Sequence, residues 1–302
     1  MAAHDNYRTQ VELLIRCLPA VASAPDFALK GGTAINLFLR DMPRLSVDID
    51  LTYLPASDRD TALTDIRSQL ATIAEGLKRT VPGTNVQLVE GDAPKLLVDK
   101  AGARIKVEPS VVIRGSLVPP VTSELCSTAQ EAFELFVEIQ RLDSPDLYAG
   151  KLCAALDRQH PRDLFDIKTL FENEGIKPEI RKAFVVYLAC HDRPISELLA
   201  PIPKDTRLTF KNEFLGMTIS PVKYRDLRMT LKTLISTLKK DLSEKERRFL
   251  VLLKEGNPDW TLLDIPGIDR LPAIQWKLRN IHKMDKKKHS DALSRLKKIL
   301  RI

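Results

Sequence analysis

The stretch FALKGGTAINLFLRDMPRLSVDIDL, residues 27–51, constrains the fold more than any other part of this chain. A short apolar run ends at Gly31 and Gly32, and the residues that follow have apolar side chains at helical spacing as far as Pro43. Residues 46–54 then alternate between apolar and polar and are rich in β-branched side chains, which is typical of a strand. The stretch therefore predicts a strand, a glycine turn, a helix and a second strand, which together begin a mixed α/β domain.

Two aspartates lie inside the second of these strands. Because side chains alternate between the two faces of a strand, Ser46, Asp48 and Asp50 point to one face and the apolar residues between them point to the core. The two carboxylates are then about 7 Å apart along the strand, and Mg²⁺ prefers a few carboxylates together with phosphate oxygens. We therefore expect Asp48 and Asp50 to be metal ligands, although a D-x-D sequence on an exposed strand is often ordinary solvated charge.

A later strand, predicted over residues 103–113, carries one more carboxylate. The same alternation turns Ile105 and Val107 toward the core, and Lys106 and Glu108 toward the other face. If this strand lies beside the one with the two aspartates, Glu108 can complete a three-carboxylate cluster as a ligand or as a general base. Carboxylates this close raise one another's pKa unless a metal neutralises them, so such a cluster implies a cation.

The glycine turn supplies the other half of a nucleotide site. A strand followed by Gly31, Gly32 and a helix N-terminus directs backbone N–H groups and the positive end of the helix dipole toward an approaching phosphate. Carboxylates that hold metal beside a turn that holds a triphosphate indicate nucleotidyl transfer, in which a hydroxyl attacks the α-phosphate of an NTP and pyrophosphate leaves. A Gly-Gly pair alone is usually only a turn, and the order of the elements is what favours the site.

The composition of the chain changes around residues 120–130. We expect an α/β catalytic domain over residues 1–125, and a mainly helical domain over residues 126–302 that begins with one more strand. Further strands are predicted at residues 85–90 and 95–100, the second joined to residues 103–113 by a hairpin turn at Lys100, Ala101 and Gly102. Helices are predicted at residues 8–22, 57–79, 146–158, 162–173, 178–190, 222–240, 243–255 and 289–301. The expected fold class is therefore α+β.

Two blocks of the sequence resemble known motifs. KGGTAINLFLRDMPRLSVDIDL, residues 30–51, is similar to the first motif of the AbiEii/MenT-type nucleotidyltransferase toxins, and SPDLYAGKLCAALDRQHPRDLFDI, residues 144–167, is similar to their later lysine and R-D-x-x-D motifs. The resemblance implies a polymerase-β-like nucleotidyltransferase domain, a mixed sheet with flanking helices, followed by a helical domain that completes the active site. It also implies the toxin of a type IV toxin–antitoxin pair, with an antitoxin encoded alongside, that adds nucleotides to the 3′ acceptor end of tRNA and so blocks translation.

The resemblance and the strand argument together assign the site residues. The expected catalytic residues are Asp48, Asp50, Lys151 and Asp163; the nucleotide-binding residues are Gly31, Gly32, Thr33, Ser46 and Lys151; the metal ligands are Asp48, Asp50 and Glu108; and the accessory residues are Lys106, Arg158, Arg162 and Asp166. Gly-Gly-Thr stands where the wider superfamily commonly has Gly-Ser, so either Thr33 or Ser46 supplies the usual hydroxyl. The sequence leaves open whether Lys106, Lys151 or Glu108 activates the attacking hydroxyl.

The later motif also has structural interpretations. Lys151 falls near the edge of the apolar stripe of its helix, where it can neutralise triphosphate charge or simply extend to solvent. Asp163 and Asp166 follow Pro161 at the start of the next helix, where acidic residues stabilise the helix dipole without any catalytic role. His160, just before Pro161, is expected to be a loop residue rather than an acid–base group.

The net charge of +7 is concentrated at the C-terminal end. Residues 223–302 contain 21 Lys and Arg and 10 Asp and Glu, a net charge of +11, whereas the first 222 residues carry −4. Cationic side chains that neutralise phosphates bind nucleic acid without reading its sequence, so a nucleic acid is the expected partner of this end of the chain, and a solvated helical face is the alternative. The resemblance to the toxin family implies that this partner is RNA, most simply tRNA.

The composition excludes several other classes of protein. No apolar run is long enough to cross a bilayer, and the first ten residues lack the layout of a secretory signal. The four cysteines have no spacing typical of a metal site or a disulfide framework. A soluble cytoplasmic protein without a membrane partner is expected.

The sequence as a whole favours a Mg²⁺-dependent nucleotidyltransferase that uses an NTP and modifies RNA. One alternative is transfer of NMP to a protein hydroxyl or to a small molecule such as an aminoglycoside. Another is a non-catalytic module that binds an NTP or RNA. A DNA-binding regulator is less favoured because the sequence has no clear helix-turn-helix pattern.

Overall fold

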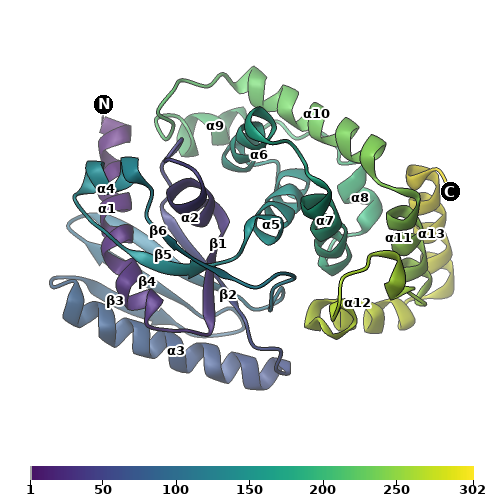
Figure 1. The fold of residues 1–302 in the computed structure, drawn as a ribbon, viewed down its shortest axis with the longest axis horizontal. Coiled ribbons are helices and arrows are strands. Elements are labelled where there is room, and N and C mark those ends of the chain that lie inside the picture. The colour runs from purple at the N-terminus through teal and green to yellow at the C-terminus, as the bar shows by residue number, and fades with distance from the viewer. Residues whose placement is uncertain (1) are drawn as a thin grey trace. The chain divides into compact units, whose positions relative to one another are not determined.

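The computed structural model describes residues 2–302, with side chains from Asp5 onward, and most of its helices and strands are labelled in Figure 1. The contacts within the chain form two compact units. The first unit contains the residues up to Leu147 together with Glu213–Val222, and the second contains Tyr148–Asn212 and Lys223–Ile302. Among the helices of residues 2–302, none combines the length and the apolarity that crossing a membrane requires.

Within the described part of the chain, the first unit is built on a seven-stranded mixed sheet. Its strands are β1 (Phe27–Lys30), β2 (Asp48–Tyr53), β3 (Asn85–Val89), β4 (Lys95–Lys100), β5 (Ala103–Ser110), β6 (Val121–Glu124) and β7 (Glu138–Arg141). They lie in the order β3-β4-β5-β2-β1-β7-β6, with β2 parallel to β5, β1 parallel to β7, and the other neighbours antiparallel. A mixed sheet with accompanying helices confirms the expected α+β class.

The helices of the first unit supply much of its apolar core. They are α1 (Ala2–Ala22), α2 (Gly31–Ala34), the π-helix η1 (Ile35–Leu39), α3 (Arg59–Thr80) and α4 (Ser127–Phe133). α3 begins where the side chain of Asp58 accepts hydrogen bonds from the backbone of the first turn, and it buries apolar residues at helical spacing, including Ile66, Leu70 and Ile73. α1 and α3 contact each other, and they also contact β5 and β3, respectively.

The hairpin expected at Lys100–Gly102 is present between β4 and β5. Lys100 pairs with Ala103 across the turn, and the two residues between them, Ala101 and Gly102, have φ angles of 50° and 82°. Two consecutive residues with positive φ make a type I′ turn, whose twist matches that of the flanking strands. The other edge of β5 pairs with β2, as the site predicted from the sequence requires.

The second unit is helical. Its elements are α6 (Pro161–Asn173), α7 (Pro178–Cys190), α8 (Ile195–Leu199), α10 (Tyr224–Asp241), α11 (Glu244–Glu255), α12 (Pro272–His282) and α13 (Lys286–Leu300), together with two short 3-10 turns, Trp260–Leu262 and Ile268–Arg270. It also contains most of α5 (Ser144–Asp157), which begins in the first unit, and most of α9 (Arg207–Glu213), whose last residue belongs to the first unit. The helices predicted from periodicity are present, most of them within a few residues of their expected bounds. α1 begins at Ala2 rather than at residue 8, and the helical segment after Gly32 ends at Leu39 rather than next to Pro43. The short elements β6, α4, α8 and α9 were not predicted, and neither were the bounds of α12.

A buried carboxylate joins α7 to α11. Glu246 is 3% exposed and accepts the backbone N–H of Ser243 at 2.7 Å, while the Ser243 hydroxyl accepts the Glu246 N–H at 3.2 Å. This reciprocal arrangement is a capping box at the start of α11. The same carboxylate lies 3.0 Å from Arg181 Nε on α7, so one side chain both starts one helix and holds it to another.

Replacing Glu246 tests this double role. Glu246→Ala is expected to lower the free energy of unfolding by about 2 to 4 kcal/mol, because it removes a helix cap and leaves Arg181 without its buried partner. Glu246→Gln keeps an oxygen for the Ser243 N–H and is expected to lose less. Urea denaturation measures both, with the exposed Glu244→Ala as control; a loss no larger than the control's would contradict the role.

Candidate active site

The turn between β1 and α2 packs directly against Asp50. Lys30, the last residue of β1, is the antiparallel partner of Asp50 on β2, so the turn that follows lies beside the aspartate. Gly31 has a φ of +70°, in the region that favours glycine. A Cβ added at Gly31 would lie 2.1 Å from Asp50 Oδ2 and 2.9 Å from its Cβ. The close approach of turn and carboxylate therefore depends on glycine.

The second glycine of the turn is packed as closely, against Arg44 and Ser46. A Cβ at Gly32 would lie 2.6 Å from Arg44 Nη2 and 2.9 Å from Ser46 Oγ. Arg44 is 1% exposed, and its Nη1 donates to the carbonyl of Leu45 at 2.8 Å. A guanidinium beside the turn adds positive charge where a phosphate would approach. Arg44 thus belongs to this site, although the sequence argument did not single it out.

The loop that carries Arg44 is held by a distant segment of the chain. The N–H of Leu45 donates to the carbonyl of Met217 at 2.7 Å, and Arg44 forms an isolated β-bridge with Thr218. Both partners lie in Glu213–Val222, the segment that returns to the first unit from within the helical part of the sequence. No local pattern could have revealed this contact, because it joins residues far apart in the chain.

Thr33 ties the helix after the glycines to the strand of the aspartates. Its hydroxyl lies 2.6 Å from the backbone carbonyl of Asp48 and 3.1 Å from Ser46 Oγ. A hydroxyl has one proton to donate. Thr33 donates it to the carbonyl oxygen of Asp48, which is the closer of the two oxygens and can only accept. The Ser46 hydroxyl can then donate its own proton either to Thr33 Oγ1 or to a ligand. The geometry therefore gives Thr33 a positioning role and leaves Ser46 as the hydroxyl of the two that is not bonded to the backbone of the strand.

Asp48 and Asp50 share one face of β2, as the alternation predicted. Ile49 and Leu51 are fully buried, whereas the two aspartates are partly exposed. β5 runs parallel to β2 with Asp50 opposite Glu108, and the burial along β5 alternates in the expected sense. The structure therefore brings the two aspartates and Glu108 into one region of the sheet, next to the glycine turn.

Glu108 also has a partner that the sequence argument did not foresee. Its Oε1 lies 3.0 Å from Lys95 Nζ on β4, and both side chains are about one-third exposed. Among residues 2–302, no three or more His, Cys, Asp and Glu side chains are grouped as a metal site. The donor set of Asp48 and Asp50 alone still fits a hard divalent cation, because Mg²⁺ is commonly held by one or two carboxylates and completes its shell with water and substrate phosphates.

A second group of charged residues lies inside the helical unit, where α5 meets α6. Lys151 Nζ on α5 lies 3.0 Å from Asp163 Oδ1 and 2.9 Å from Asp166 Oδ2 on α6. Both carboxylates are almost fully buried, and Lys151 is 6% exposed. Arg158, whose side chain is largely exposed, donates to both oxygens of Asp163 at 2.5 and 3.0 Å. The structure thus joins the lysine and both aspartates of the later motif, with Lys151 buried rather than extended to solvent.

The charges of this group determine the ionisation of Asp163. Burial by itself would raise the pKa of Asp163, but the charge of Lys151 and the hydrogen bonds from Arg158 and Lys151 outweigh it and hold the pKa well below its ordinary value. Asp163 is therefore a carboxylate at neutral pH. It accepts hydrogen bonds and holds Lys151 and Arg158 in position.

The remaining residues of the later motif have local roles at the start of α6. His160 is the N-cap residue, and its Nδ1 accepts the backbone N–H of Arg162 at 3.1 Å. His160 thus lies in the turn just before α6, which agrees with its expected loop position. Asp163 lies in the first turn of α6, so the helix dipole also favours its negative charge.

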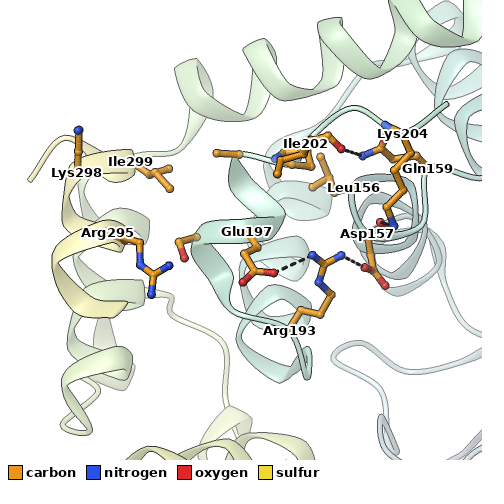
Figure 2. Close-up of a pocket in the computed structure, with 13 residues that line it drawn as sticks. Leu156, Asp157, Gln159, Arg193, Glu197, Ile202, Lys204, Arg295, Lys298 and Ile299 are labelled. Atoms are coloured by element: carbon orange, nitrogen blue, oxygen red, sulfur yellow. Dashed lines mark hydrogen bonds and ion pairs between the residues drawn. The ribbon is translucent and has the colours of Figure 1, made fainter. Parts of the chain in front are cut away.

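A surface cavity of about 620 Å³ lies in the helical unit, next to the end of α5 and the residues that follow it. Figure 2 shows it between residues at the end of α5, on α8 and on α13, with Arg193 bridging Asp157 and Glu197. Gln159 fixes the 202–204 segment on its rim, because its side chain bonds the carbonyl of Ile202 and the N–H of Lys204, each at 2.8 Å. Asp157 faces this cavity, while the next residue, Arg158, reaches Asp163.

A mixed sheet with a glycine turn packed against paired aspartates is the arrangement expected of a nucleotidyltransferase, and comparison with known proteins gives the family. The family described as "Nucleotidyl transferase AbiEii toxin, Type IV TA system" matches residues 12–280. The chain therefore belongs to the AbiEii family of nucleotidyltransferase toxins, as its motifs indicated.

A solved structure has a similar fold along almost the whole chain. It is MenT4, a nucleotidyltransferase toxin from Mycobacterium tuberculosis H37Rv, with 17% sequence identity, a TM-score of 0.58 and 98% of each chain covered. At this identity the likeness extends to the fold alone. A search of curated protein sequences found no match.

The close packing of Gly31 generates a prediction about the turn. Gly31→Ala is expected to displace Asp50 and to lower the nucleotidyltransferase rate by about 100-fold or more, the usual effect of moving a reacting group by about 1 Å. The matched control is Gly102→Ala, which has a φ of +82° but open space around it and is expected to lose only about 1 to 2 kcal/mol of stability. Equal rates for the two variants would contradict the packing argument.

The ionisation of Asp163 generates a prediction about pH. Because its pKa is lower in the folded chain, Asp163 contributes stability in full above the ordinary carboxyl pKa of about 4. That stability is lost as the pH falls from about 4 through the lower pKa that Asp163 has in the folded chain. Asp163→Asn is therefore expected to lower the free energy of unfolding by about 3 to 5 kcal/mol at pH 7, with a smaller difference from the wild type at pH 3.

Denaturation curves across that pH range provide the measurement. The exposed Glu172→Gln on the same helix serves as control, and its curve is expected to run parallel to that of the wild type. If the free energies of unfolding of Asp163→Asn and the wild type differ by the same amount at every pH, Asp163 is not ionised in the folded chain.

Proposed function

We propose that this protein is the Mg²⁺-dependent toxin of a toxin–antitoxin pair that transfers NMP from an NTP to RNA, at the 3′ acceptor end of tRNA, and so blocks translation in the cytoplasm. Membership of a nucleotidyltransferase toxin family supports the transfer and implies an antitoxin partner. The single observation that carries the proposal is the packing of Asp50 against the Gly31 turn, since it puts a carboxylate beside the backbone amides that are proposed to bind phosphate.

The proposed reaction is an in-line displacement at phosphorus. The oxygen of the acceptor hydroxyl forms a bond to the α-phosphorus, the bond from that phosphorus to the β-phosphate oxygen breaks, and pyrophosphate leaves while the hydroxyl proton passes to a base. Asp48 and Asp50 are the residues that would hold Mg²⁺, which when bound neutralises negative charge on the triphosphate. Glu108 is proposed to act as a third ligand or as the base, after release from Lys95.

The glycine turn is proposed to bind the triphosphate. The backbone N–H groups at Gly31 and Gly32 begin a short helical segment whose first turn is not capped by the side chain of Lys30, so phosphate oxygens can accept from them. Ser46 would donate its hydroxyl proton to the same group. Arg44, buried behind Gly32, adds positive charge that favours the bound anion.

The lysine–aspartate group of the helical unit is proposed to act on phosphate charge. Lys151 is held by two buried carboxylates, which fix its ammonium in one position and therefore make it a defined cation. Arg158 and Arg162 provide further donors near the same helix ends, with Asp163 positioning Arg158. Lys106, exposed beside Asp48 in the sheet register, remains a candidate contact for the acceptor or the triphosphate.

RNA is the proposed acceptor because of the charge of the helical part. The +11 carried by residues 223–302 favours a polyanion, and a partner of this charge binds largely through counterion release. A protein hydroxyl or a small molecule would not need such a surface. Binding of NTP or RNA without catalysis is the other outcome that an experiment must separate.

The experiment offers labelled NTPs and Mg²⁺ with purified tRNA, with lysate protein, or with no acceptor. Label is expected in tRNA alone, with pyrophosphate released, and chelation of the metal is expected to stop the reaction. Asp48→Ala is expected to lower transfer by about 1000-fold or more, corresponding to several kcal/mol of charge stabilisation, and to abolish growth arrest on expression.

The matched control is Glu124→Gln, which removes an exposed carboxylate from β6 at the far edge of the sheet and is expected to leave transfer unchanged. Label in lysate protein and not in tRNA would show that RNA is not the acceptor and that a protein hydroxyl is. Nucleotide binding without pyrophosphate release in the wild type would refute the enzyme, and full activity of Asp48→Ala with an intact fold would refute the site.

A further inference from the structure

Trp276 lies on the surface of the helical unit with its side chain 60% exposed. It belongs to α12, whose inner face is fixed by the buried Ile274 and Ile281. Lys277 anchors the same helix by donating from Nζ to the backbone carbonyl of His191 at 2.5 Å. Because these contacts set the rotation of α12, the exposure of Trp276 follows from the packing of the helix and not from a free chain end.

The exposed face of α12 combines this indole with cations. Arg279 and Asn280 follow Trp276 at the spacing of one helical turn and Lys283 at the spacing of two, and all of them are exposed. Trp276 and Lys283 are therefore about 10 Å apart along the helix axis. The lysine run 286–288 begins α13 immediately beyond, and it is also exposed.

The charge around Trp276 is strongly positive. Residues 272–302 contain 10 Lys and Arg and two Asp, a net charge of +8 that exceeds the +7 of the entire chain. Large apolar side chains at protein–protein interfaces usually have apolar neighbours that form a dry centre. On its helix face Trp276 has Arg279 and Asn280 instead, so a polyanion with flat apolar groups of its own fits this face better than a protein does.

We propose that Trp276 is a stacking platform for an unpaired base of the RNA, with Arg279 and Lys283 binding the phosphates next to that base. This inference rests on the RNA acceptor proposed above and adds that the RNA is bound through a single-stranded segment. Bases inside a duplex are stacked on each other and cannot cover an indole, whereas unpaired bases stack on exposed aromatic side chains and their backbone binds neighbouring cations.

Fluorescence tests the contact directly. The second tryptophan of the chain, Trp260, is partly buried and packs on Phe249 with ring centroids 6.0 Å apart, so Trp260→Phe leaves Trp276 as the only indole. In that variant an oligouridine is expected to quench the emission, and an RNA duplex of the same length is expected to quench it much less. Equal quenching by both RNAs, or quenching by polyglutamate as strong as by oligouridine, would overturn the proposal; the second result would point to an acidic protein partner.

Binding affinity separates stacking from charge. Measured by the anisotropy of labelled oligouridine, Trp276→Ala is expected to bind about 5- to 100-fold more weakly, the range for one base–aromatic stack, and Trp276→Phe is expected to restore most of the loss. Lys283→Ala is expected to weaken oligouridine and duplex alike, because it removes only a phosphate contact. Leu208→Ala, which truncates another exposed apolar side chain of the same unit, is the matched control.

The outcomes distinguish this inference from the proposed function. If wild-type protein transfers NMP to tRNA and Trp276→Ala does so with an unchanged KM for tRNA and unchanged oligouridine affinity, the platform is wrong and the enzyme stands. If oligouridine binds and Trp276→Ala weakens it while no RNA accepts label, the platform stands and the proposed acceptor is wrong. Thermal unfolding of each variant checks that the exposed substitutions leave the fold intact.

Discussion

The first unit depends on one steric constraint, the absence of a side chain at residue 31. The antiparallel register of β1 and β2 puts Asp50 opposite Lys30, and the carboxylate then occupies the space where a Cβ of residue 31 would be. Glycine is required there twice, for its positive φ and for the space. Without it either the turn or the aspartate would have to move, and the backbone amides of the turn would separate from the carboxylate.

The contacts around this turn explain why its residue types occur in this order. Thr33 donates a hydrogen bond to the carbonyl of Asp48, so the helix cannot move away from the strand without breaking a partly buried hydrogen bond. Gly32 lets Arg44 and Ser46 approach from the other side. The motif is therefore a packing unit as well as a set of functional groups, and the same substitutions are expected to affect both stability and chemistry.

The parts of this site that could be predicted are those set by short-range periodicity. The alternation along β2 and β5 correctly gave the faces of Asp50 and Glu108, because a strand imposes its period on every residue. Helical periodicity located the starts of α6, α7 and α11 to within one residue for the same local reason.

The parts that could not be predicted depend on pairing between distant segments. Lys95 meets Glu108 only because β4 folds back on β5, and Arg44 is buried only because residues 213–222 return to its loop. The burial of Lys151 is a similar case, since its position at the edge of an apolar stripe fits both a solvated and a buried side chain until α6 is placed against α5. Short elements such as β6 and α8 have too few residues to show a period.

The lysine–aspartate group of the helical unit is difficult to explain by stability alone. Burying three charged groups has a large desolvation penalty, and well-packed apolar residues in such places are often equally or more stabilising. Two carboxylates and one ammonium also leave a net negative charge, which the exposed Arg158 compensates from the surface side. Apolar residues could supply the cohesion between α5 and α6 as well. The choice of charged residues therefore agrees with the proposed role of Lys151 and Arg158, which requires both cations to be held in fixed positions.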